Sequence, residues 1–118
     1  MEATEVKRWL NKIINQRKAL LRMNKCKRNA ALMASITDRL SKQLEAYNYD
    51  GDKIFAFVKK HYTDILLIIQ GQGDKREKQN LQYLNQVALW YENLERKRKL
   101  LENTHTPHCP MQLQLLPA

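Results

Sequence analysis

Proline and glycine are scarce in this chain of 118 residues, which has three of each. All three prolines lie near the C-terminus, at Pro107, Pro110 and Pro117. Proline inside a helix removes a backbone hydrogen bond and clashes with the preceding turn, so the first 106 residues contain no proline barrier to helix formation. Valine, which favours strands, is also rare, whereas Leu, Lys, Gln, Glu and Arg are common. The composition predicts an all-α protein.

Cysteines and long apolar runs are also few. Cys26 and Cys109 stand far apart, and a secreted domain of this size usually has four or more cysteines. No uninterrupted apolar run exceeds five residues, whereas a membrane helix needs roughly 20. The N-terminus carries Glu2 and Glu5 and lacks the apolar stretch of a signal peptide. We therefore expect a soluble, cytoplasmic protein with free thiols and no membrane partner.

Motifs of catalysis are missing from the sequence. It contains no phosphate-binding glycine loop, no nucleophile elbow and no HExxH zinc motif. Asp50, Asp52 and Asp64 are too sparse to define an acid–base pair, and the first two suit a turn and a helix cap. We expect no catalytic residues, no cofactor and no small-molecule substrate.

A metal site is also not expected. His105, His108 and Cys109 share one proline-flanked loop, but a tetrahedral site needs a fourth ligand. Cys26 or His61 would have to be brought in by the fold. His61 lies within an apolar stretch, where a hydrogen-bonded core histidine is the simpler interpretation.

Carboxylates are missing where cations are densest. The net charge is +9, and residues 1–47 hold eleven basic and four acidic groups. Between Lys7 and Arg28 there are nine cations and no carboxylate. A helix face of one sign is unfavourable alone, because like charges at i,i+4 repel, and it becomes favourable beside a polyanion. We call the following residues the basic face and predict that they bind nucleic acid or another polyanion: Lys7, Arg8, Lys12, Lys18, Arg22, Lys25, Lys27 and Arg28.

Two other interpretations of the basic face remain open, an acidic protein partner and a solvated helix surface. The chain has no zinc-finger spacing, RNP pattern or GxxG loop, and it fits a helix-turn-helix only loosely. Binding would therefore go mainly to backbone phosphates, with a non-specific Kd of roughly 10⁻⁴ to 10⁻⁶ M. Trp9 could stack on a base, but its position beside Ile13 on the apolar stripe favours the core.

Apolar periodicity predicts three or four helices. The first begins near Thr4, and a break around Asn24–Asn29 is expected because the next stripe, from Leu32 to Tyr47, is rotated by about 150°. After a turn at 48–52, a helix over about 53–70 is apolar over most of its girth, which is typical of a bundle centre. Gly71 to Gly73 ends it, and a last helix covers about 74–103.

The last helix carries a coiled-coil-like seam with a 3-4-3-4-3 spacing. Trp90 and Leu89 lie beside this seam and could form a second packing surface or a docking site. A cluster of four cations at 96–99 suits a helix C-terminus or an extension of the polyanion surface. The residues predicted to contact a protein partner, or a second copy of the chain, are Leu84, Val87, Trp90, Tyr91, Leu94, Arg98 and Leu101.

Two arginines interrupt apolar stripes, Arg17 on the first helix and Arg98 on the seam. Either the alkyl stem packs while the charged head reaches water, or the head meets an acidic partner, with Glu45 and Glu95 as internal candidates.

Together these patterns predict a single helical domain over 1–103, a small bundle or long helical hairpin, with an irregular tail over 104–118. The expected function is that of a non-enzymatic accessory protein that holds nucleic acid on the basic face and a protein on the seam. The alternative is a pure protein–protein adaptor or chaperone whose basic face meets an acidic partner.

Overall fold

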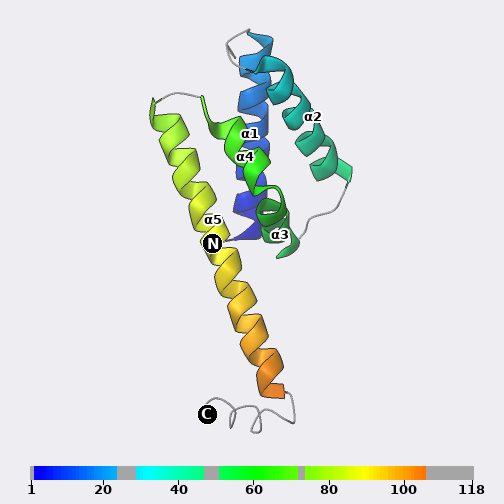
Figure 1. Cartoon of the computed structure of the whole chain (residues 1–118), viewed down its shortest axis with the longest axis vertical. Helices are drawn as coiled ribbons and strands as arrows, with labels where there is room; N and C mark the ends of the chain where they lie inside the picture. Colours follow the sequence, from blue (N-terminus) through cyan, green and yellow to red (C-terminus); the bar gives the residue numbers. More distant parts are fainter. Residues whose placement is uncertain (1, 24–28, 47–50, 72–73, 106–118) are drawn as a thin grey trace.

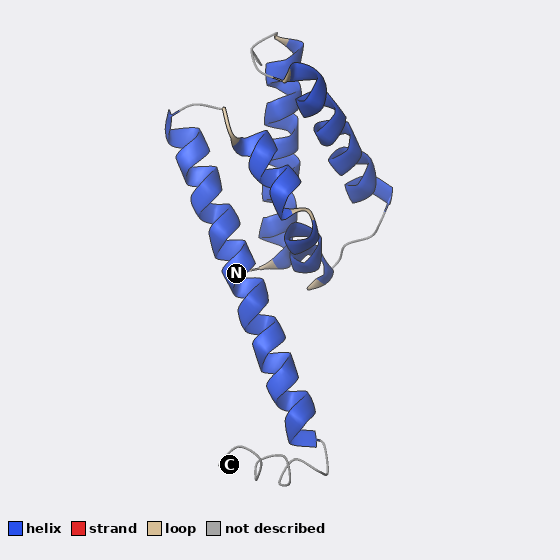
Figure 2. Cartoon of the chain, in the orientation of Figure 1, coloured by secondary structure: helices blue, strands red, loops and turns tan. Residues whose placement is uncertain are grey.

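The computed structural model describes residues 2–23, 29–46, 51–71 and 74–105, with the backbone alone at 74 and 103–105. Within these ranges the chain forms five helices and no strand (Figures 1 and 2). The helices are α1 (Ala3–Arg22), α2 (Ala30–Ala46), α3 (Lys53–Lys60), α4 (Tyr62–Ile69) and α5 (Asp74–His105). The predicted all-α class is confirmed, but the described residues form five helices where three or four were predicted. Of the predicted tail, 106–118 lie outside the described residues.

The expected break after the first helix is present. Helix α1 ends at Arg22, and α2 begins at Ala30 after Asn29, whose φ of 51° is left-handed. Asparagine tolerates this conformation better than most residues, because its short polar side chain can hydrogen-bond locally. The break lets each helix turn its own apolar stripe toward the core.

The helix expected over 53–70 is divided at His61, which corrects that prediction. The His61 backbone (φ −104°, ψ 23°) closes α3 and opens α4, donating to Phe57 O at 3.0 Å and accepting from Ile65 N at 2.9 Å. A helix that is apolar all round must be covered all round. Two short helices instead present two separate apolar faces to the core. Asp52 precedes α3 as predicted, but its side chain makes no capping hydrogen bond.

His61 is half-buried at this joint, with its ring 4.5 Å from that of Phe57. Burial lowers the pKa of His61 below its ordinary value of 6.5, and the nearby Lys60 and Arg39 lower it further while Asp64 opposes them. Its environment therefore differs from the hydrogen-bonded core histidine expected from sequence.

We predict that acid destabilises the fold through His61. Because the folded pKa lies below 6.5, the unfolded chain binds the proton more tightly. The free energy of unfolding should therefore fall as the pH drops from above 6.5 to the folded pKa, and this contribution should level off below it. Urea unfolding of the wild type and of His61→Gln between about pH 5 and pH 8 measures the effect. Parallel pH dependences of the two proteins would contradict the prediction.

All five helices contribute to one hydrophobic core. Helix α1 lies centrally and packs on α2, α3 and α4, while α5 packs mainly on α3 and α4 (Figure 1). The largest fully buried side chains include Phe55 and Phe57 from α3 and Leu84 from α5. The remaining buried apolar residues are Val6, Leu10, Ile13, Ile14, Ile36, Leu40, Leu44, Ile54, Val58, Ile65, Ile68, Ile69 and Val87.

Helix α5 continues well beyond the other four helices (Figure 1). Its last core residue is Val87, and every side chain from Arg96 to Glu102 is exposed. The radius of gyration of 18.7 Å exceeds the roughly 13–14 Å of a compact domain of this length because of this projection. None of the helices in the described ranges combines the length and the hydropathy that crossing a lipid bilayer requires.

Candidate functional site

Arg17, the cation within the apolar stripe of α1, has a structural role. Its side chain is only 3% exposed, its Nε donates to Ile68 O at 2.9 Å, and its Nη2 donates to Gln70 O. These carbonyls lie at the C-terminal end of α4, where carbonyls lack helical donors and the helix dipole favours a cation. The guanidinium thus meets backbone carbonyls, which neither sequence alternative included.

The basic face on α1 is only partly exposed. Arg8, Lys12 and Arg22 are exposed, whereas Lys7 and Lys18 are half-buried. The Lys18 ammonium donates to Ser41 Oγ on α2 at 2.9 Å. The predicted members Lys25, Lys27 and Arg28 lie outside the described residues.

The three exposed cations of α1 are not neutralised within the described part of the chain. The carboxylates of Glu2, which precedes α1, and of Glu5, in its first turn, come before all three in sequence. No ion pair within the described ranges joins Arg8, Lys12 or Arg22 to a carboxylate. The cations of α2, by contrast, are paired: Arg39 with Asp64 at 3.1 Å and Lys42 with Asp38 at 3.1 Å. Among the residues described, helix α1 therefore presents three unpaired cations, whereas the cations of its neighbour α2 are paired.

The predicted seam of α5 divides into two parts. Leu84 and Val87 are fully buried by the chain's own helices, and Tyr91 and Leu94 are half-buried against the same core. In this fold Leu84 and Val87 are not accessible to another protein. Trp90, Arg98 and Leu101 are exposed, and Arg98 pairs with Glu95 at 2.8 Å, one of the internal partners considered from sequence.

A further arrangement on α5 was not predicted from the sequence. Arg76, Tyr83, Trp90 and Lys97 are spaced seven residues apart, so they share one face of the helix at intervals of about 10.5 Å. We call these four residues the α5 column. Arg76, Trp90 and Lys97 are exposed, and Tyr83 is half-buried. The seven-residue spacing that defined the seam could have revealed this second line as well.

The α5 column meets α1 at Trp9. The Trp9 and Tyr83 rings lie 4.8 Å apart at a tilt of 56°, and Trp9 Nε1 donates to Asn80 Oδ1 at 3.1 Å. Burial raises the pKa of Tyr83 above its ordinary value of 10.0, and the Glu5 carboxylate raises it further. The expectation that Trp9 belongs with the core is confirmed, since its half-buried ring packs against it. Arg8 and Lys12 lie on the helical turns around Trp9.

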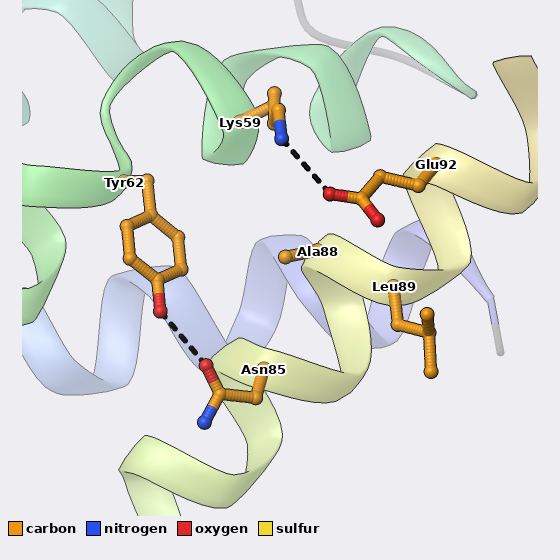
Figure 3. A pocket seen from close by; sticks show the side chains of 6 residues that line it. All are labelled: Lys59, Tyr62, Asn85, Ala88, Leu89 and Glu92. Atoms are coloured by element: carbon orange, nitrogen blue, oxygen red, sulfur yellow. Dashed lines mark hydrogen bonds and ion pairs between the residues drawn. The ribbon is translucent and has the colours of Figure 1, made fainter.

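On the other side of α5, a small cavity separates it from α3 and α4 (Figure 3). Two contacts cross it: Tyr62 Oη donates to Asn85 Oδ1 at 2.8 Å, and Lys59 Nζ pairs with Glu92 at 3.2 Å. Ala88 and Leu89 complete the α5 wall. The charged groups here satisfy each other, so these contacts serve mainly to hold α5 against α3 and α4.

Among the described residues no group of three or more His, Cys, Asp or Glu side chains could hold a metal ion. The His105, His108 and Cys109 side chains considered from sequence lie outside those described. Comparison with protein-family models, with curated proteins and with solved structures found no match.

Proposed function

We propose that the chain is a non-enzymatic protein that binds nucleic acid through α1. The observation that carries the proposal is the exposure of Arg8, Lys12 and Arg22 on a helix whose sequence has no carboxylate after Glu5. Like charges on one helix repel, and phosphate groups relieve this repulsion while releasing condensed counterions. Contacts of this kind are made to the backbone and carry little sequence preference.

The structure narrows the residues on which the proposal relies. Arg17 donates hydrogen bonds to the C-terminal end of α4, and Lys18 donates one to Ser41. Lys7 is half-buried. Arg8, Lys12 and Arg22 are therefore the described α1 residues assigned to phosphate contacts.

A protein partner is a second candidate function, on the projecting half of α5. Leu101 there is 62% exposed, and Trp90, on the same side of the helix about 16 Å away, is 39% exposed; exposed large apolar side chains commonly mark interaction surfaces. The predicted protein contact is thus retained only for the seam residues that lie beyond the core. In the rival adaptor function, the basic face would also meet an acidic protein.

The proposal predicts salt-sensitive binding of the wild-type protein to oligonucleotides, measured by fluorescence anisotropy with single strands and duplexes. If three α1 cations each neutralise one phosphate, log K for a duplex should fall against log salt with a slope of about −2.7 or steeper. A lack of binding to both oligonucleotides at low salt would overturn the proposal. Binding to polyglutamate without binding to either oligonucleotide would support the adaptor function instead.

A further inference from the structure

The α5 column places two aromatic side chains between two cations along one line. Arg76 stands at one end and Lys97 at the other, with Tyr83 and Trp90 between them. Trp90 is 39% exposed and, unlike Trp9 and Tyr83, is not among the residues packed on the core. Its ring therefore presents an aromatic surface to solvent between two cations.

The described carboxylates of α5 lie away from the column. At 100° per residue the column occupies an arc of about 60°, and Glu77, Glu92, Glu95 and Glu102 occupy an arc of about 80° centred about 150° away. Glu92 and Glu95 pair with Lys59 and Arg98, and Glu77 accepts from Gly71 N. The positions three residues after each column member are uncharged: Gln79, Gln86, Asn93 and Leu100.

The column touches α1 through Tyr83. Its contact with Trp9 joins the two helices, and Arg8 and Lys12 lie within one helical turn of Trp9 in the sequence. Glu5 is the carboxylate at this junction, and it lies on the N-terminal side of both cations.

We infer that the α5 column binds single-stranded nucleic acid, an inference that rests on the proposed function and specifies its ligand. Arg76 and Lys97 contact phosphates, and a base stacks on Trp90. Proteins that bind single strands combine a cationic track with aromatic side chains on which unpaired bases lie. A duplex keeps its bases stacked inside, so it gains nothing from Trp90. An acidic protein would use the cations but gives no reason for an exposed tryptophan between them.

The test compares Trp90→Leu with the wild type on an oligothymidylate and on a duplex of the same length, by anisotropy at low salt. Loss of one base–aromatic stack should weaken binding to the single strand by about 5- to 150-fold. Affinity for the duplex and its salt slope should be unchanged. Leu89→Ala, at the adjacent position, which is 57% exposed and off the column, is the matched control and should change neither affinity.

A second measurement observes Trp90 directly. In Trp9→Phe, Trp90 is the remaining tryptophan, so quenching of its fluorescence by oligothymidylate but not by the duplex reports stacking. Unchanged affinity of Trp90→Leu for the single strand, with duplex binding intact, would overturn this inference and leave the proposed function standing. Failure of the wild type to bind either oligonucleotide would overturn both this inference and the proposed function. Quenching of Trp90 fluorescence by polyglutamate, but not by oligothymidylate, would assign the column to an acidic protein.

Discussion

Replacing Arg17 with alanine should reduce the free energy of unfolding by about 2–4 kcal/mol, because it removes a buried charged donor from two carbonyls. Ile68 O and Gln70 O would lose the contacts that close α4, and the space of the side chain would be left empty. A loss of this size is a large fraction of the roughly 5–15 kcal/mol that stabilises a typical domain. Urea unfolding followed by circular dichroism measures it.

Arg22→Ala is the matched control for Arg17→Ala, since Arg22 is an exposed arginine on the same helix and should change stability by less than about 0.5 kcal/mol. Arg17→Met retains most of the apolar stem but cannot donate hydrogen bonds. Comparing it with Arg17→Ala separates the contributions of packing and of hydrogen bonding to the free energy of unfolding. Equal stabilities of the Arg17→Ala and Arg22→Ala proteins would show that the contacts at the end of α4 contribute nothing.

Reversing Arg8, Lys12 and Arg22 to glutamate should weaken binding to a duplex by about 100-fold or more at low salt, because three phosphate contacts become three repulsions. The slope of log K against log salt should become shallower by about 2.7. The same anisotropy titrations measure both quantities. Since all three side chains are exposed, the fold should be retained.

A matched control reverses Lys53, Lys60 and Lys78, exposed lysines on α3 and α5 that lie off the column, and makes the same change in net charge. If binding depends on α1 in particular, this control should lose much less affinity than the α1 variant. Equal losses in the two proteins would mean that net charge alone attracts the oligonucleotide, and the assignment of the site to α1 would be abandoned.

The helical class and the break after α1 could be predicted because they depend on local patterns. Apolar residues of one phase predict α1, and the changed phase after Leu32 predicts a new helix. The division at His61 left no comparable signal. Residues 54–69 are apolar on nearly every side of a helix, so they form no single apolar stripe. A break is recognised by a change in the direction of such a stripe, and here there is none to follow.

The roles of the two exceptional arginines could not be predicted for a different reason. Sequence patterns identify partners by their side chains, but the partners of Arg17 are backbone carbonyls, which every residue has. These carbonyls lie 51 and 53 residues further along the chain. Arg98 has its partner three residues away, within one turn of helix, and Glu95 was accordingly among the candidates. Local contacts can be found from spacing, whereas contacts to a distant helix end require the fold.

The seam illustrates what periodicity can and cannot show. It correctly marked one face of α5 as apolar, but it could not distinguish packing on the same chain from packing on another. Leu84 and Val87 turned out to pack on the chain's own core. The same seven-residue spacing carries Trp90 and Lys97 along a neighbouring face, where the core ends before the helix does.

The part of α5 that leaves the bundle is mechanically a lever arm. The bundle holds the helix as far as Leu94, which packs on the core, and the helix continues for some 11 residues to His105, or about 16 Å. A tilt of about 10° at this pivot would move the far end by about 3 Å over that length. Any ligand that spans Tyr83 and Lys97 would therefore touch both the fixed and the projecting parts of α5. A small change of packing at the pivot would produce a larger displacement at the end of the helix.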